Sequence, residues 1–277
     1  MAEIAVDASK KALAAAGREG AEVDAVYCAA ANMQRAYPAM ACEIQAALGA
    51  GGYGFDMNVA CSSATFGIEQ AANAVQCGTA RAVLVVNPEI TSAHLAWRDR
   101  DCHFIFGDVC TAVLVERADT AAPGSWEILG TRLATKYSNN IRNNFGFLNR
   151  CELPPRDPDE LLFVQDGRQV FREVIPIVSA LITRGLGELG IEVSAIKRFW
   201  LHQANLSMNE LILKRVLGRA ANENEAPIVL DEYANTSSAG SVIAFHKHHE
   251  GFAKGDLGVL CAFGSGYSAG IAVLRKL

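Results

Sequence analysis

The stretch GYGFDMNVACSSATFGIEQAANAV, residues 52–75, decides the fold prediction, because a strand and a helix meet in it at one cysteine. Tyr53–Val59 has the composition of a strand, and Ser62–Cys77 is typical of a buried helix. Cys61 lies between them, so its thiol is expected at the helix N-terminus, where free N–H groups and the helix dipole favour a thiolate. A nucleophilic cysteine needs such a lowered thiol pKa. From position alone, a buried cysteine without a catalytic role is an equally good interpretation.

The sequence around this turn is repeated in the second half of the chain. DAVYCAAAN at 24–32 resembles KRFWLHQAN at 197–205, and ACSS at 60–63 resembles ANTS at 234–237. The matched positions and their offsets are Asn32 and Asn205 (173), Cys61 and Asn235 (174), Ala82 and Gly258 (176), and Ala112 and Ala272 (160). An insertion at Thr91–Phe104 explains the last, smaller offset. The repeat predicts two similar half-domains, 1–122 and 123–277.

Strand-like and helix-like segments alternate through both halves, which is typical of an α/β protein with mostly parallel sheets. Apolar spacing near 3.6 residues predicts further helices at Ala2–Ala16 and Val174–Leu189. The other predicted strands are Ala25–Ala29, Ala82–Val86, Ala112–Glu116, Trp126–Leu133, Arg198–His202, Ile228–Asp231, Val259–Phe263 and Gly270–Leu274. Only the second half has a strand ahead of its first helix. We therefore expect the first strand of the amino-terminal sheet to be absent from this chain.

The composition excludes several classes of protein. With 51% hydrophobic and 20% charged residues, the chain is typical of a globular protein, and a net charge of −5 without a Lys/Arg-rich run argues against nucleic acid. No apolar run is long enough for a membrane helix, so we expect a cytosolic location without membrane contact. The eight cysteines contain no C-x-x-C pair, which argues against a disulfide framework and favours buried small side chains for all but Cys61.

Two further segments of the second half place polar groups near the expected site. His202 closes a strand, and in an α/β sheet this end faces the crevice where ligands bind. Asn235 occupies the turn equivalent to that of Cys61, although asparagine is also a common helix cap. AFGSGYSAG, with Ser265 at its centre, could present backbone N–H groups to an oxyanion, or be only a tight turn. The histidines at 246, 248 and 249 form a weak metal signal, and we predict no metal.

Together these motifs resemble the β-ketoacyl-acyl-carrier-protein synthase III family of the thiolase superfamily. The matching pieces are NVACSSATFG at 58–67, IFGDVCTAVLVE at 105–116, LHQAN at 201–205, YANTSSAG at 233–240 and AFGSGYSAG at 262–270. The resemblance covers nearly the whole chain. It implies a thiolase-like fold, in which two duplicated half-domains with five-stranded sheets stack in αβαβα layers, and it implies a homodimer.

The resemblance also implies a mechanism without a cofactor. Cys61 takes an acyl group from acyl-CoA, and the backbone N–H groups of Cys61 and Ser265 hold the oxyanion. A malonyl thioester, carried by acyl carrier protein, then loses carbon dioxide. His202 and Asn235 stabilise the resulting enolate, which attacks the acyl-enzyme.

Four peripheral residues match family positions. Arg100 corresponds to an arginine near the coenzyme A nucleotide, and Tyr37 to an aromatic residue that reaches the partner's acyl pocket. Lys214 and Arg215 lie on a helix that presents basic residues to acyl carrier protein. The alternatives are a solvated salt bridge for Arg100, core packing for Tyr37 and a solvated helix face for Lys214 and Arg215. At this position the family often has an arginine that binds the carrier protein, and Ser207 departs from that pattern.

Two other functions are compatible with the same residues. The scaffold could transfer the acyl group from Cys61 to an alcohol or amine without decarboxylation. It could also be a non-catalytic homologue, since the expected first strand is missing. Retention of Cys61, His202 and Asn235 favours decarboxylative condensation over both.

Overall fold

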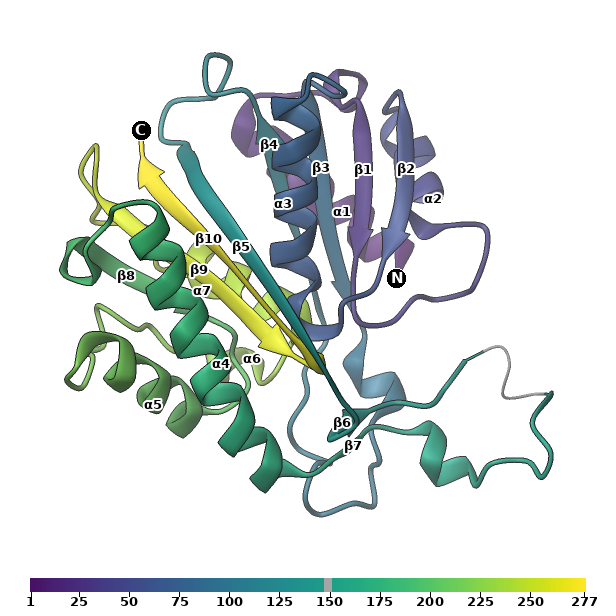
Figure 1. Cartoon of the computed structure of the whole chain (residues 1–277). Helices are drawn as coiled ribbons and strands as arrows, with labels where there is room; N and C mark the ends of the chain where they lie inside the picture. Colours follow the sequence, from purple (N-terminus) through teal and green to yellow (C-terminus); the bar gives the residue numbers. More distant parts are fainter. Residues whose placement is uncertain (147–150) are drawn as a thin grey trace.

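The computed structural model describes residues 1–146 and 151–277, which form five layers of helices and sheets. Helices α1 (Ala2–Ala16) and α2 (Met40–Leu48) cover the outer face of a first sheet. Helix α3 (Ser63–Gln76) lies between this sheet and a second one (Figure 1). Helices α4 (Gly167–Glu188) and α5 (Leu206–Leu217) form the opposite outer layer. The predicted layering of α/β elements is confirmed.

The first sheet has the strand order β2-β1-β3-β4. Strand β1 pairs in parallel with β2 and β3, and β3 pairs antiparallel with β4. Strands β1 and β3 are buried along their whole length, whereas β2 lies at an edge and is partly exposed. The bounds are β1 Ala25–Ala29, β2 Tyr53–Met57, β3 Ala82–Glu89 and β4 Val109–Glu116.

The second sheet has the order β5-β10-β9-β8, with short helices α6 and α7 beside it. Strand β8 pairs in parallel with β9, whereas β10 is antiparallel to both of its neighbours. The bounds are β5 Trp126–Ser138, β8 Ile196–Leu201, β9 Leu257–Gly264, β10 Gly266–Lys276, α6 Leu230–Tyr233 and α7 Gly240–Lys247. A separate ribbon pairs β6 (Ile141–Arg142) with β7 (Val164–Gln165).

Two details of the predicted sheets are wrong. The second sheet has four strands within the described residues instead of the predicted five, because Ile228–Asp231 is not a strand, whereas the first sheet has the four strands predicted for this chain. The Val229 N–H is bound by the Gln203 side chain at 3.0 Å, and the Val229 carbonyl accepts from Tyr233 in a helical turn. The sheets are also mixed, and β10 makes two antiparallel pairings in the second one. The pairing with β9 follows from the turn, because only Ser265 separates the two strands and a chain that reverses so tightly pairs antiparallel.

The duplication extends to unusual backbone angles. Ala60, just before Cys61, has φ 47°, and Ala234, just before Asn235, has φ 56°. Positive φ is uncommon for residues with a β-carbon and tends to occur at functional turns. A positive φ at both matched positions supports the alignment of the two halves.

The cysteines differ in exposure, and Cys61 and Cys110 are half-buried. Cys28, Cys102 and Cys261 are buried, as predicted, whereas Cys42, Cys77 and Cys151 are exposed. The prediction of burial is therefore wrong for these three, which lie on helix surfaces or in connections. Across the described residues every cysteine is a free thiol, and no helix is long and apolar enough to cross a membrane.

An aromatic cluster at one end of the second sheet contributes much of its core. The fully buried Trp200 ring lies 5.5 Å from that of Trp126 and 4.9 Å from that of Phe245, and its Nε1–H donates to the His248 carbonyl at 3.0 Å. We expect Trp200→Ala to lower the free energy of unfolding by about 3–5 kcal/mol, because it leaves a large cavity. Urea denaturation measures this. Tyr137→Ala is the control: that side chain is 88% exposed, and a change above about 1 kcal/mol there would contradict the assignment.

Candidate active site

Cys61 lies in the 3₁₀ turn η2 (Ala60–Ser62), between β2 and α3. Side-chain hydrogen bonds hold this turn: Asn58 Oδ1 accepts from the Ala60 N–H at 2.9 Å, and Ser63 Oγ donates to the Ala60 carbonyl at 2.8 Å. Gly264, at the end of β9, packs against the cysteine so closely that an added β-carbon would lie 3.0 Å from Sγ and 2.6 Å from the Cys61 Cβ. The nucleophile candidate is therefore fixed by contacts from both halves.

The equivalent turn of the second half faces Cys61. It is followed by the 3₁₀ turn η7 (Ser237–Ala239), where Ser237 Oγ lies 3.5 Å from the Cys61 Sγ. The Asn235 side chain uses its Oδ1 to accept the Ser237 N–H at 2.9 Å, which leaves its Nδ2 group to donate elsewhere. Backbone hydrogen bonds to Ile105 and Gly107 hold Asn235 against the first half. The predicted convergence of the two turns is thus present in the structure.

His202 follows β8 and is 2% exposed. The His202 backbone N–H donates to the Cys261 carbonyl at 2.8 Å, and the His202 carbonyl accepts from Asn209 Nδ2 at 3.0 Å. Burial lowers the pKa of the imidazole to about 4, although a hydrogen bond with the Ser237 backbone raises it. At neutral pH the ring is uncharged and carries one N–H donor. Ser237 thus contacts both Cys61 and His202.

The expected thiolate at the helix start is not supported. Burial raises the pKa of the Cys61 thiol to about 11, and this outweighs the hydrogen bonds from Ser237 and from the backbone N–H groups of Cys61 and Ser265, which lower it. Removing a thiolate from water disfavours its charge more than these few donors favour it. The thiol is therefore protonated at rest. The same backbone contacts place both N–H groups at the sulfur.

Glu89 is a buried group of this site that the sequence analysis missed. It ends β3, is completely buried, and accepts hydrogen bonds from the N–H groups of Ala31 at 3.1 Å and Ser238 at 3.2 Å, and from the Ser238 hydroxyl. Burial raises the pKa of its carboxyl to about 7. The available signal was a carboxylate directly after an apolar strand, in AVLVVNPE.

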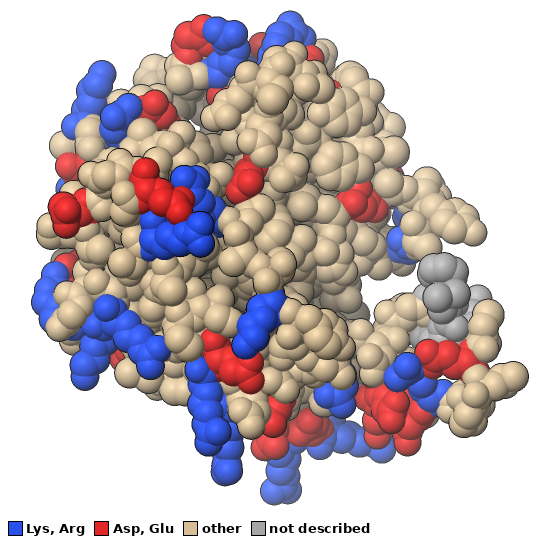
Figure 2. Space-filling view, viewed as in Figure 1, with Lys and Arg blue, Asp and Glu red and all other residues tan. Residues whose placement is uncertain are grey.

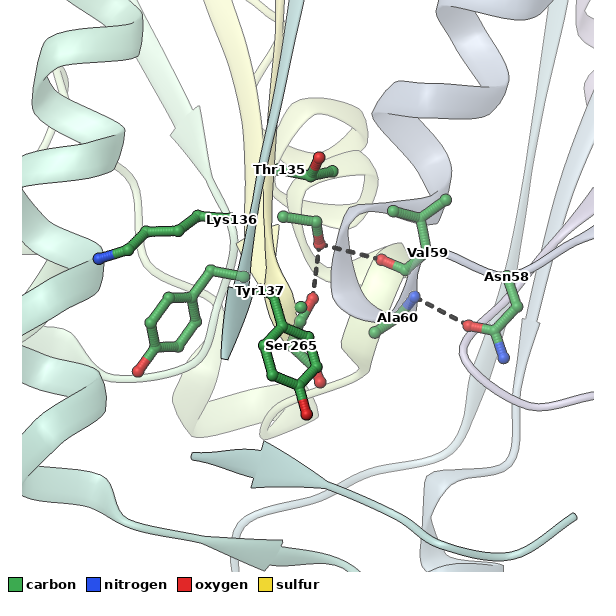
Figure 3. Close-up of a pocket in the computed structure, with 10 residues that line it drawn as sticks. Asn58, Val59, Ala60, Thr135, Lys136, Tyr137 and Ser265 are labelled. Carbon is green, nitrogen blue, oxygen red and sulfur yellow. Dashed lines mark hydrogen bonds between the residues drawn. The ribbon is translucent and has the colours of Figure 1, made fainter. Parts of the chain in front are cut away.

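A hollow of about 400 Å³ between the two halves is lined by Asn58–Ala60, which directly precede Cys61 in the chain, and by residues of β5, β10 and the turn after β9. Figure 3 shows Asn58–Ala60 from the first half on one side and Lys136 and Tyr137 of β5 on the other, with Ser265 between them. The Ser268 hydroxyl donates to the Ser265 carbonyl at 2.8 Å and lies 3.2 Å from the Val59 carbonyl, which ties the turn after β9 to the turn that precedes Cys61. A ligand in this hollow would lie next to the Ser265 backbone.

The four peripheral residues lie on the surface. Tyr37 is 85% exposed on the connection between β1 and α2, which excludes core packing within this chain. Arg100 is exposed after η3 (Thr91–His94), and Lys214 and Arg215 are exposed in the last turn of α5. Within the described residues, no hydrogen bond joins any of them to Cys61, His202 or Asn235. Figure 2 shows Lys and Arg side chains gathered at the lower left, over α5.

Two duplicated α/β halves that bring a cysteine, a histidine and an asparagine together at their matched ends define a thiolase-fold protein. Models of the amino-terminal and carboxy-terminal parts of 3-oxoacyl-[acyl-carrier-protein] synthase III match residues 55–136 and 186–276. The chain belongs to this family, whose members are acyl-transferring condensing enzymes.

Individual relatives agree with this assignment. Over 277 residues the chain is 59% identical to a β-ketodecanoyl-[acyl-carrier-protein] synthase of Pseudomonas aeruginosa, covering 100% of this chain and 79% of the relative. It is 31% identical to a β-ketoacyl-[acyl-carrier-protein] synthase III of Acidiphilium cryptum, with 97% and 82% covered. The crystal structure of 3-oxoacyl-[acyl-carrier-protein] synthase III from Aquifex aeolicus VF5 superposes with a TM-score of 0.85 at 27% identity, with 98% and 83% covered.

We expect Gly264→Ala to slow alkylation of Cys61 by iodoacetamide at least about tenfold, because the new methyl group occupies the space at Sγ and must displace the thiol. Peptide mass spectrometry of the labelled cysteine measures the rate. Gly187→Ala is the matched control, since its β-carbon meets nothing within 4 Å. Equal labelling of Cys61 in both variants would show that Gly264 does not define the approach to the sulfur.

Proposed function

We propose that this enzyme condenses an acyl group from acyl-CoA with a malonyl thioester on acyl carrier protein, through an acyl-Cys61 intermediate. The proposal rests on the contact between Cys61 and the turn Asn235–Ser237, next to His202, whose ring is neutral. The name of the Pseudomonas aeruginosa relative, a β-ketodecanoyl-[acyl-carrier-protein] synthase, supports the same chemistry. No step uses a metal or an organic cofactor.

In the first half-reaction, Cys61 Sγ attacks the acyl-CoA carbonyl carbon and coenzyme A leaves as its thiol. The negative charge on the tetrahedral oxygen is stabilised by the backbone N–H groups of Cys61 and Ser265. Both groups already point at the sulfur, so they need little rearrangement to reach an oxygen on the adjacent carbon. Gly264 leaves room for this carbon because it has no side chain.

In the second half-reaction, the malonyl thioester loses carbon dioxide and its enolate attacks the acyl-Cys61 carbonyl. Cys61 then leaves as a thiolate, and the new carbon–carbon bond gives a β-ketoacyl thioester. His202 and Asn235 are the donors to the enolate oxygen. Their state supports this role: the His202 ring is neutral, and the Asn235 Nδ2 group is available because Oδ1 is held by Ser237.

The peripheral residues and the partner chain are part of the proposal. Lys214 and Arg215 bind the acidic carrier protein, and Arg100 binds the coenzyme A nucleotide; all three are exposed, as such contacts require. Tyr37 extends to the acyl pocket of a second copy, which agrees with its exposure. The half-domain boundary at 122 falls in the connection from β4 to β5. A cytosolic location is proposed from the sequence alone.

Two substitutions separate the half-reactions. We expect Cys61→Ala to form no acyl-enzyme, because it removes the nucleophile. We expect Asn235→Ala to acylate within about threefold of wild type but to condense at least about 10²-fold more slowly, because it removes a donor used only for the enolate. Intact-protein mass spectrometry measures acylation, and release of labelled carbon dioxide from malonyl-acyl carrier protein measures condensation.

The same assay distinguishes the alternatives. Acylation of Cys61 without release of carbon dioxide in the wild type would favour transfer to an alcohol or amine. Equal loss of both half-reactions in Asn235→Ala would contradict the role given to that residue. Lack of acyl-enzyme in the wild type would indicate a non-catalytic homologue.

The dimer is tested through the edge of the first sheet. Strand β2 is an edge strand whose Tyr53 and Phe55 are 39% and 36% exposed, and an apolar free edge can pair with its copy. We expect sedimentation at twice the chain mass of 29.6 kDa, and a monomer for Phe55→Glu. The control is Leu211→Glu on α5, also exposed, which should remain dimeric. A monomeric wild type, or a dimer unchanged by Phe55→Glu, would refute this interface.

A further inference from the structure

The Ser268 hydroxyl, near the start of β10, meets polar groups on both sides of the site. Its Oγ donates to the Ser265 carbonyl at 2.8 Å, and it lies 3.2 Å from the Val59 carbonyl and 3.0 Å from the Ser62 hydroxyl. Figure 3 marks the contacts with the two carbonyls by dashed lines. Val59 and Ser62 lie on either side of Cys61 in the chain. One hydroxyl, on a side chain that is 3% exposed, thus joins the turn after β9 to the turn of the nucleophile.

This link and one close packing contact fix the spacing of the two segments. In the part of the chain that the structure describes, the contacts of Ser268 are the only side-chain hydrogen bonds between residues 58–62 and 264–268. Gly264, the residue before Ser265, lies so near Cys61 that an added β-carbon would be 3.0 Å from Sγ. The packing therefore keeps the segments from moving closer together, and the hydroxyl keeps them from separating.

The other side of the same turn is held by β6 and the residue before it. Ser265 Oγ donates to the Ile141 carbonyl at 2.8 Å, and the hydroxyl of the buried Tyr267 accepts from Asn140 Nδ2 at 2.9 Å. These contacts fix the Ser265 side chain, and Ser268 fixes the Ser265 carbonyl. The backbone of Ser265 is thus restrained on both sides, which leaves its N–H group little freedom to turn.

We propose that Ser268 is the positioning residue of the oxyanion hole, the pair of backbone N–H groups of Cys61 and Ser265. The inference rests on the proposed acylation of Cys61 and adds the group that keeps the two donors aligned. These donors come from different halves of the chain, so no single strand or helix sets the distance between them. Both must lie within hydrogen-bond distance of one oxygen to stabilise it together, and a shift of either segment weakens that stabilisation. Ser268 acts on the reaction only through these two groups.

Alignment of the hole affects some reactions of the thiol and not others. Acylation by an ester or thioester passes through a tetrahedral intermediate, whose oxygen carries a negative charge that the hole stabilises. Alkylation by iodoacetamide displaces iodide from a saturated carbon and forms no oxyanion. The ratio of the two rates at Cys61 therefore reports on the hole, because the accessibility and the reactivity of the thiol enter both rates.

We expect Ser268→Ala to lower the ratio of the acylation rate to the alkylation rate at Cys61 at least about tenfold, because the two donors lose their alignment. The acylating probe is p-nitrophenyl acetate. It transfers an acetyl group to the sulfur, releases p-nitrophenol and needs neither coenzyme A nor carrier protein. Peptide mass spectrometry of Cys61 gives both rates. A merely structural role of Ser268 would change both rates together and leave their ratio unchanged.

Ser179→Ala is the matched control. Ser179 is also buried, and its hydroxyl donates to the Ile175 carbonyl at the same 2.8 Å, but both residues lie on α4. We expect a ratio within about twofold of wild type, because this bond lies outside the two joined segments. An unchanged ratio in Ser268→Ala, or an equal drop in both variants, would overturn the inference. So would a wild-type Cys61 that is alkylated but not acylated by the ester.

A second variant covers the case that Ser268→Ala does not fold, as judged by its thermal melt. Ser268→Cys then decides, because a thiol is similar in size to the hydroxyl group but a weaker donor. The same drop in the ratio is expected, with peptide mass spectrometry separating Cys61 from the new cysteine, and an unchanged ratio would overturn the inference.

These measurements separate the inference from the proposed function. If the ester acylates wild-type Cys61 and the ratio drops in Ser268→Ala, but acyl-CoA forms no acyl-enzyme, the proposed function fails and the inference stands. Formation of acyl-enzyme from acyl-CoA in the wild type, with an unchanged ratio in Ser268→Ala, would refute the inference alone.

Discussion

The contact between two strained turns, one from each half of the chain, is the constraint on which the site depends. Ala60 and Ala234 both have positive φ, and each directs the following side chain toward the other half. Such a conformation is unfavourable for an alanine and persists only where surrounding contacts fix it. Here those contacts include the Asn58 side chain on one turn and the backbone of Ile105 on the other.

Burial is the second controlling factor, because it sets the charge of every group near the sulfur. It keeps His202 neutral and the Cys61 thiol protonated, and it raises the proton affinity of Glu89. A site of this kind stabilises developing negative charge with oriented N–H groups and not with a full positive charge. Fixed donors in a dry environment are effective because they need no reorganisation when the charge appears.

Much of this arrangement could be predicted from the sequence, because duplication relates residues that are far apart in the chain. The match of Cys61 to Asn235 predicted that two turns meet, and the structure places Ser237 of the second turn against the sulfur. The helix Ala2–Ala16 and the strand Ala25–Ala29 have the predicted bounds, since their patterns are regular and their ends carry clear turn residues.

The parts that were missed depend on tertiary contacts. Ile228 and Val229 have strand propensity, but the Gln203 side chain takes the backbone donor that a sheet would use. The thiol was expected to ionise at a helix start, and only the packed structure reveals how strongly it is desolvated. Glu89 was overlooked because the predicted strand stopped at Val86, before Asn87 and Pro88, whereas β3 continues to the carboxylate.

The two halves, although built alike, have come to supply complementary chemistry at equivalent positions. The first half contributes the sulfur at its turn and a carboxylate at the end of β3, and the second contributes donors: the Asn235 amide, the His202 ring and the hydroxyls of η7. An asparagine cannot replace a nucleophile, and a thiol is a poor hydrogen-bond donor. Cys61 and Asn235 occupy equivalent turns but carry different side chains. This difference gives the two sides of the site distinct roles.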